Sequence, residues 1–261
     1  VESIDVQSTA VAVADATVTL TRSVRLVGLS DYYVRIDQGV FLAEAAGTTD
    51  AVPMLLQDFE RLSLGPAVDE DPTKGDGTDW TATPPSGWAV DNSNNATGGV
   101  TEYRGWTFLD KDVWNAWSGQ GRDAFTLGSG TVAVADTDEF DDIANGRPTD
   151  TLLLTPALSL AAVAGTQVAI EFDSSFRPEG GGGGFAEGNQ AGVVEVTFDG
   201  GENWTNLLTL DGDNSTGSID DPSVNRREQL VADIPDGATT MQVRWGQQGT
   251  NDYWWAIDNV N

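Results

Sequence analysis

The chain has 261 residues, of which 41 are Asp or Glu and 13 are Lys or Arg, and its net charge at pH 7 is −28. This charge repels phosphate backbones and anionic lipid surfaces, which argues against nucleic-acid binding. Because Cys and His are both absent, disulfides, thiolate nucleophiles, Cys/His zinc sites and Ser-His-Asp triads are excluded, and any metal must be a hard, oxygen-ligated cation, calcium before magnesium.

Short alternating runs begin near the N-terminus, and with 30 Gly, 10 Pro and abundant Thr, Val and Asp they predict an all-β chain. Within residues 1–53, the strand candidates are ATVTLTRSV and DYYVRIDQGVFL. Two or three strands are too few to close a sandwich by themselves. Val1 in place of Met predicts a chain that is processed or cut from a longer protein.

The N-terminal segment also carries a family resemblance. VESIDVQS…ATVTLTRSVRLVGLSDYYVRIDQGVFLAEAAGT resembles the second half of a bacterial Ig-like domain of the S-layer-associated type, with departures at Glu44 and at Gly47-Thr48. The resemblance implies that residues 1–53 form a partial Ig-like β domain with open sheet edges. Either the remainder of the domain lies upstream, or another chain, such as a second copy of this one, supplies the missing strands.

Residues 54–261 are predicted to form the main unit, a jelly-roll sandwich of two β-sheets. Its longest apolar stretches are interrupted well short of ~20 residues, so membrane insertion is not expected. PEGGGGGFAEGN is predicted to be a flexible loop. The strand candidates are MLLQDFERL, RGWTFLD, GTVAVAD, TLLLTPALSL, QVAIEFDSSFRPE, GVVEVTFDG, WTNLLTLDG, EQLVADIP, TMQVRWGQQ and YWWAIDNV.

Several phrases of this unit occur in a recognisable order. They include DFERLSLGP, YRGWTFLDKDVW, SGTVAVADTDEFDD, VEVTFDGGENWTNLLTLDGDNS and MQVRWGQQGTNDYWWAIDNV. Together they resemble a jelly-roll module of secreted bacterial proteins that is related in pattern to MAM and cleaved-adhesin domains. Such modules often accompany phosphoesterases or surface anchors, so the resemblance implies a module of a larger secreted protein more than it implies an activity.

In this type of sandwich the first and last strands are expected to lie near each other. Asp58 and Glu60 would then share one face of the first strand, while Phe59 and Ile257 point into the core. Asp258 would meet Asp58 or Glu60, and carboxylates that close repel each other unless a cation lies between them. We therefore predict a structural calcium ion that ties the two ends of the unit together.

A second acidic group follows the strand GTVAVAD. Asp136 and Asp138 are predicted metal ligands, and Asp138 either joins the same calcium ion or contributes to a second one; the alternative is a solvated turn. The loops 69–79 and 211–221 resemble calcium loops only superficially, because neither has the spacing of an EF-hand.

The tryptophan rings can either pack in the core or bind a ligand. Trp254 and Trp255 are adjacent on one predicted strand, so one is expected to be buried and the other exposed. If a sugar binds, the exposed ring would be its platform, with Arg177 or Asp252 as polar partners. Arg177 alternatively forms a buried ion pair.

Acidic pairs at glycosidase spacing carry no information in a chain with 41 carboxylates, so catalysis is not expected. We predict a noncatalytic, calcium-stabilised module for adhesion or glycan binding, in an extracellular or cell-surface protein of a bacterium, with a charge suited to saline water. Two alternatives stay open. One is a structural subunit of a filament or surface layer, completed by a neighbour through residues 1–53. The other is an accessory domain of a secreted hydrolase such as a phosphatase.

Overall fold

A computed structural model describes residues 53–261 except 67–76, 96, 117–119, 144–147, 164, 179–189 and 212–223, and two short strands nearer the N-terminus. Contacts divide the chain into two compact units, residues 1–56 and 57–261. In the first unit, β1 (Val11–Ala14) and β2 (Thr17–Leu20) pair antiparallel. The segment DYYVRIDQGVFL, and with it the predicted Ig-like sheet and its open edges, lies outside the described residues.

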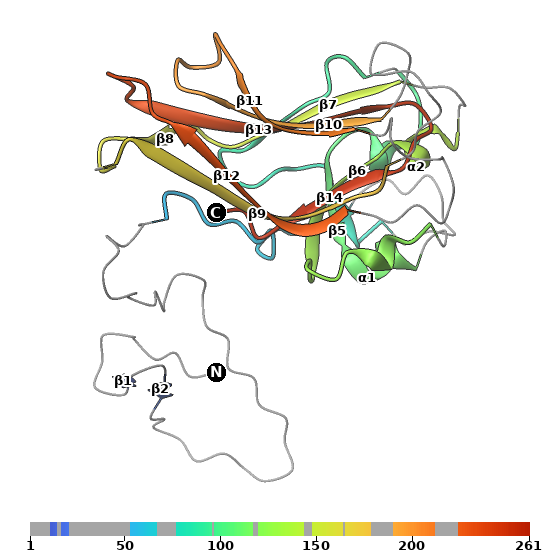
Figure 1. Ribbon diagram of the computed structural model, residues 1–261. Coiled ribbons are helices and arrows are strands. Elements are labelled where there is room, and N and C mark those ends of the chain that lie inside the picture. Colours follow the sequence, from blue (N-terminus) through green and yellow to red (C-terminus); the bar gives the residue numbers. More distant parts are fainter. Residues whose placement is uncertain are drawn as a thin grey trace. The chain divides into compact units, whose positions relative to one another are not determined.

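The second unit is a two-sheet antiparallel sandwich, which confirms the predicted all-β jelly-roll class (Figure 1). One sheet, here the upper sheet, has the order β11-β10-β13-β7-β4, with β8 beside β13; the lower sheet has the order β12-β9-β14-β6-β5-β3. The strands are β3 (Trp80–Thr81), β4 (Ala89–Asp91), β5 (Thr107–Asp110), β6 (Thr131–Asp136), β7 (Thr149–Leu154), β8 (Leu158–Ser159), β9 (Gln167–Phe176), β10 (Ala191–Thr197), β11 (Thr205–Asp211), β12 (Val224–Asp233), β13 (Thr240–Gly249) and β14 (Trp254–Asp258).

The predicted first strand, MLLQDFERL, is not a strand. It forms a single antiparallel bridge, in which Gln57 and Val260 exchange two backbone hydrogen bonds of 2.9 Å. The chain then turns at Phe59, whose φ is +57°, and the Gln57 side chain accepts a hydrogen bond from the Phe59 N–H at 2.7 Å. A left-handed residue cannot continue a ladder. The predicted proximity of the two ends of the unit is nevertheless confirmed, and each of the other predicted segments contains a strand.

Aromatic rings fill the space between the sheets, which we call the inner core. Trp245 stacks on Trp88 at 5.9 Å between ring centroids, and Trp255 lies 5.5 Å from Trp106. Phe59 is fully buried 5.8 Å from the Trp88 ring, which confirms its predicted core position. Large rings with favourable tilted or edge contacts supply much apolar burial from few residues.

A second apolar layer, the outer core, covers the other face of the lower sheet. It is built by short helices that the sequence did not lead us to expect: η1 (Thr101–Tyr103), α1 (Lys111–Asn115), η2 (Arg122–Ala124) and α2 (Thr137–Asp141). None of the helices among the described residues is long and apolar enough to cross a bilayer. The outer core consists of Trp80, Val100, Tyr103, Leu109, Trp114, Phe125, Val132, Val134, Phe140, Tyr253, Trp254 and Ala256.

The outer core explains the double tryptophan of the last strand. Trp255 points into the inner core, whereas Trp254 points into the outer core, 4.9 Å from the Trp114 ring. Both rings are 0% exposed, so the prediction that one of them faces solvent is wrong. The alternation of faces was correct, but both faces of β14 are covered, one by the side chains between the two sheets and the other by the short helices of the outer core.

Candidate functional site

Carboxylates do meet where the two ends of the sandwich join. Asp258 on β14 lies opposite Asp173 on β9, and the Glu60 carboxylate packs against Gly130, next to the Ser129 N–H that bonds Asp258 at 3.1 Å. A side chain at position 130 would collide with Glu60. Glu60, rather than Asp58, is therefore the residue that faces Asp258; the Asp58 carboxylate instead accepts the Glu60 N–H at 3.2 Å.

Asp258 has an unusual electrostatic environment. Its side chain is buried, and the loss of hydration raises its pKa to about 7. Hydrogen bonds from the Ser129 and Asn259 N–H groups lower the pKa, while the charges of Glu60 and Asp173 raise it further. Asp173 also accepts a hydrogen bond from Arg227 at 3.1 Å. No group of three acidic side chains that could by itself hold a metal ion is found among the described residues.

Asp136 and Asp138 lie elsewhere. Asp136 on β6 pairs with Trp254 on β14, and Trp254 lies four residues along β14 from Asp258, so the backbones of Asp136 and Asp258 are about 14 Å apart. A single calcium ion shared between Asp138 and Asp258 is not compatible with this spacing.

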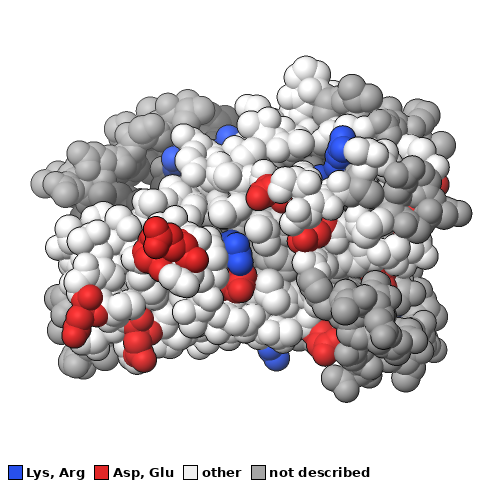
Figure 2. Space-filling view, turned by 90° about the horizontal axis from the view of Figure 1, so that it is seen from above, with Lys and Arg blue, Asp and Glu red and all other residues white. Residues whose placement is uncertain are grey.

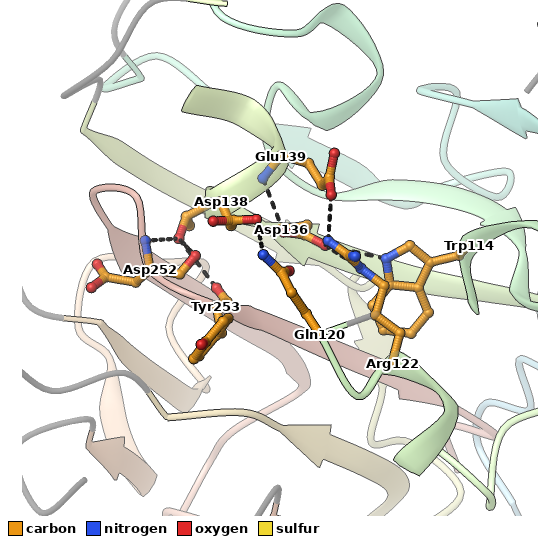
Figure 3. Close-up of polar contacts among 9 residues, drawn as sticks. Trp114, Gln120, Arg122, Asp136, Asp138, Glu139, Asp252 and Tyr253 are labelled. Atoms are coloured by element: carbon orange, nitrogen blue, oxygen red, sulfur yellow. Dashed lines mark hydrogen bonds and ion pairs between the residues drawn. The ribbon is translucent and has the colours of Figure 1, made fainter. Parts of the chain in front are cut away.

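Asp136 is instead part of a buried ion cluster, shown in Figure 3. Arg122 donates to it from Nε at 3.1 Å and from Nη2 at 2.9 Å, and also contacts Glu139 at 2.6 Å. The Trp114 ring nitrogen donates to the same Asp136 oxygen at 3.2 Å. The other oxygen caps α2 by accepting the Glu139 N–H at 3.2 Å. We call Arg122, Asp136 and Glu139 the buried ion cluster; the Arg122 guanidinium balances the charge of Asp136 there.

Asp138 lies beside this cluster and accepts a hydrogen bond from the Gln120 side-chain amide (Figure 3). Burial, followed by the negative charge of Asp136, raises its pKa to about 6. The Asp-x-x-Glu spacing of residues 136–139 resembles a capping box, which is the signal that would have predicted α2.

The predicted sugar contacts are also buried. Arg177 lies 4.4 Å from the Tyr253 ring centroid, and Asp252 accepts the Thr250 N–H at 2.6 Å. Arg177 and Asp252 are 4% and 7% exposed. With both rings of the Trp254–Trp255 pair inside the protein, this set cannot present an aromatic platform to a sugar.

A groove lies instead on the outer face of the upper sheet, which Figure 2 views from above. Its volume is about 370 Å³, within the range of ligand pockets of ~300–1,000 Å³. In that view most of the described surface carries no charge, and acidic side chains occur in separate patches. The groove is lined by Asn94, Asp150, Leu152, Val193, Glu195, Arg244, Gly246 and Gln248.

Gly246 lies at the floor of the groove. It lies on the central strand β13, opposite Leu152 on β7 and Val193 on β10. A Cβ atom at this position would come within 2.9 Å of Val193 Cγ2 and 3.0 Å of Leu152 Cδ2. The Leu152 and Val193 side chains therefore close over the buried glycine and form a shallow aliphatic floor.

Polar side chains on the walls are held in place by one another. Arg244 donates to Glu195 from Nε at 2.7 Å, and its guanidinium lies 4.1 Å from the Trp204 ring centroid. Asn94 donates to the Asp150 carboxylate at 3.0 Å. Trp204 is partly exposed, in contrast to the buried rings of Trp254 and Trp255. None of the residues on this face was among the predicted site residues, although the period-2 alternation of TMQVRWGQQ places Gln242, Arg244, Gly246 and Gln248 on one face of the strand.

The two acidic side chains of the groove are far apart. Asp150 pairs with Gln248 and Glu195 pairs with Arg244, on opposite sides of β13 and four residues apart along it. With strands ~4.8 Å apart and a rise of ~3.3 Å per residue, their backbones are separated by about 16 Å. Glycosidase carboxyl pairs are ~5–9.5 Å apart.

No protein-family model and no curated protein matches the sequence. Among solved structures, the K3 cleaved adhesin domain of Lys-gingipain from Porphyromonas gingivalis W83 is 16% identical, with a TM-score of 0.43 over 79% of this chain and 96% of that chain. The K1 domain is 17% identical, with a TM-score of 0.42 over 68% and 90%. TmCBM61, solved with β-1,4-galactotriose, is 13% identical, with a TM-score of 0.38 over 67% and 86%. These likenesses are too distant to indicate a ligand.

Proposed function

We propose that residues 57–261 form a noncatalytic glycan-binding module of a larger secreted or surface protein, and that the groove of the upper sheet is its binding site. The observation that carries the proposal is the pairing of a shallow aliphatic floor, formed by Leu152 and Val193, with fixed polar walls. Leu152 and Val193 offer apolar surface to the C–H face of a sugar, and Arg244, Glu195 and Asp150 offer groups for its hydroxyls. Their mutual hydrogen bonds restrict their rotamers before binding, which lowers the entropy lost on association.

The noncatalytic part of the proposal is supported by the wide spacing of Asp150 and Glu195 and by their engagement with Asn94 and Arg244. Neither carboxylate is placed to act with the other on one glycosidic bond.

Binding to a panel of soluble polysaccharides, followed by affinity electrophoresis and calorimetry, tests this function. Arg244→Ala should weaken binding about tenfold or more, because it removes one wall of the groove and releases Glu195. Arg226→Ala is the matched control, since Arg226 forms a similar 2.7 Å pair with Glu228 on β12, in the other sheet. Equal binding by Arg244→Ala and the intact protein, or hydrolysis of the polysaccharide, would contradict the proposal.

We further propose that a calcium ion stabilises the junction between the two ends of the sandwich, with Glu60 and Asp258 among its ligands and backbone or amide oxygens completing the shell. The proposal is supported by the closeness of two carboxylates of which one, Asp258, is buried and has no cationic partner among its hydrogen bonds to the described residues. A cation between them would remove their mutual repulsion.

Thermal unfolding with added calcium and with excess chelator tests the calcium proposal. Chelation should lower the melting temperature by several degrees, because an ion that binds only the folded state stabilises it by mass action. Asp258→Ala should abolish this difference, whereas Asp136→Asn should leave it in place. A melting temperature that chelator does not change would overturn the proposal, while the glycan proposal would stand.

A further inference from the structure

We infer that the groove selects uncharged glycans and rejects uronic-acid and sulfated chains. This inference rests on the proposed glycan-binding function and names the class of ligand for that site. It follows from the charges that line the groove and from the way in which its one basic side chain is already used.

Arg244 is the only basic residue among the described residues that line the groove. The Nε and Nη2 atoms of Arg244 each lie 2.7 Å from Glu195 Oε2. Trp204 covers one face of the guanidinium at 4.1 Å. Its positive charge is therefore neutralised and part of its surface is shielded. A sulfate or carboxylate group of a ligand would have to displace Glu195 before it could pair with Arg244.

The remaining charge in the groove is negative. Asp150 lies on β7 and is held by the uncharged Asn94, whose amide donates to it at 3.0 Å. Asn94 and Gln248 add neutral amides. The lining of the groove thus contains two carboxylates, Asp150 and Glu195, and one guanidinium, that of Arg244. The net charge of the whole chain is also negative, at −28. Sugar hydroxyls can donate hydrogen bonds to these oxygens, whereas an anionic substituent would face like charge.

The ion pair also predicts how selectivity can be changed. In Glu195→Gln the guanidinium of Arg244 loses its anionic partner but keeps its position beside Trp204. The wall then presents an unpaired positive charge, and anionic chains should gain affinity in a salt-dependent manner. Asp150→Asn removes the other negative charge without creating an unpaired positive one, so it should reduce the discrimination less.

Matched pairs of polymers test the inference: dextran with dextran sulfate, hydroxyethylcellulose with carboxymethylcellulose, and galactan with polygalacturonate, each measured at low and at physiological salt. We expect the intact protein to bind a neutral chain at least about tenfold more tightly than its anionic counterpart. Glu195→Gln should narrow that ratio at low salt, and Arg226→Ala should leave it unchanged. Melting temperatures of the variants identify any loss of fold.

Two results would overturn the inference in different ways. If the anionic member of a pair binds as tightly as the neutral member, the selectivity is wrong and the glycan-binding function stands. If no polymer of either class binds the intact protein, the proposed function itself fails and the selectivity fails with it.

Discussion

Removing Arg122 should be among the most destabilising single changes in this protein. Its side chain is 1% exposed, and it holds the charges of Asp136 and Glu139, whose side chains are 0% and 1% exposed. Replacement by Met keeps a similar volume, so little of the cost arises from a cavity. The loss arises because two buried carboxylates lose the guanidinium that they contact. Breaking a buried ion pair from one side costs about 3–5 kcal/mol.

In Arg122→Met, Asp136 should contribute to the loss at the lower end of this range. It keeps hydrogen bonds from the Trp114 ring nitrogen and the Glu139 N–H, which still stabilise its charge. For a domain of this size, about 3–5 kcal/mol corresponds to a fall in melting temperature of roughly 6–20 °C. Urea unfolding monitored by tryptophan fluorescence gives the free energy of unfolding directly. The denaturant slope should be unchanged if the folded state keeps its compactness.

Two comparisons make the result decisive. Arg226→Met removes an arginine whose side chain is 53% exposed, and it should change the free energy of unfolding by about 1 kcal/mol or less. The triple variant Arg122→Met, Asp136→Asn, Glu139→Gln removes the buried charges together and should recover much of the loss. If Arg122→Met alone costs less than about 1 kcal/mol, the carboxylates are not dependent on Arg122 and the reasoning is wrong.

Three further predictions concern single residues. Burial and the charge of Asp136 raise the pKa of Asp138 from an ordinary 3.8 to about 6. Between these two pH values the folded state binds more protons than the unfolded state. The free energy of unfolding should therefore fall as the pH rises from about 4 to about 6. Asp138→Asn should flatten that part of the stability profile, measured by unfolding at constant ionic strength, and a profile identical to that of the intact protein would contradict the prediction. Gln247 is 0% exposed, and neither atom of its amide has a hydrogen-bond partner among the described residues. Gln247→Met should therefore raise the free energy of unfolding by about 1–3 kcal/mol, whereas a lower melting temperature would mean that the amide is satisfied by water. Gly130 has φ +57° and lies against Glu60, so Gly130→Ala should cost about 1–3 kcal/mol in denaturant unfolding, and a neutral result would exclude strain at this turn.

The sequence alone determined the β class, most of the strands and which side chains face inward along them. These features depend on local alternation, and the period-2 pattern of QVAIEFDSSF or TMQVRWGQQ is present in the letters themselves. The closeness of Gln57 and Val260 followed from the resemblance to sandwich modules. The buried positions of Phe59 and Ile257 followed from alternation around Asp58 and Asp258, although Phe59 reaches the core through a left-handed turn instead of a strand.

Only the tertiary structure decided what covers each face and what balances each charge. Trp254 is buried because α1, α2 and η1 pack over the outside of its sheet, and no pattern within YWWAIDNV contains that information. Asp136 is paired with Arg122 because η2 brings that guanidinium to the outer face of the lower sheet. The groove exists because Leu152, Gly246 and Val193 come from three strands that the chain order does not place side by side. Burial and electrostatic environment depend on neighbours that are distant in sequence, and strand order fixes those neighbours.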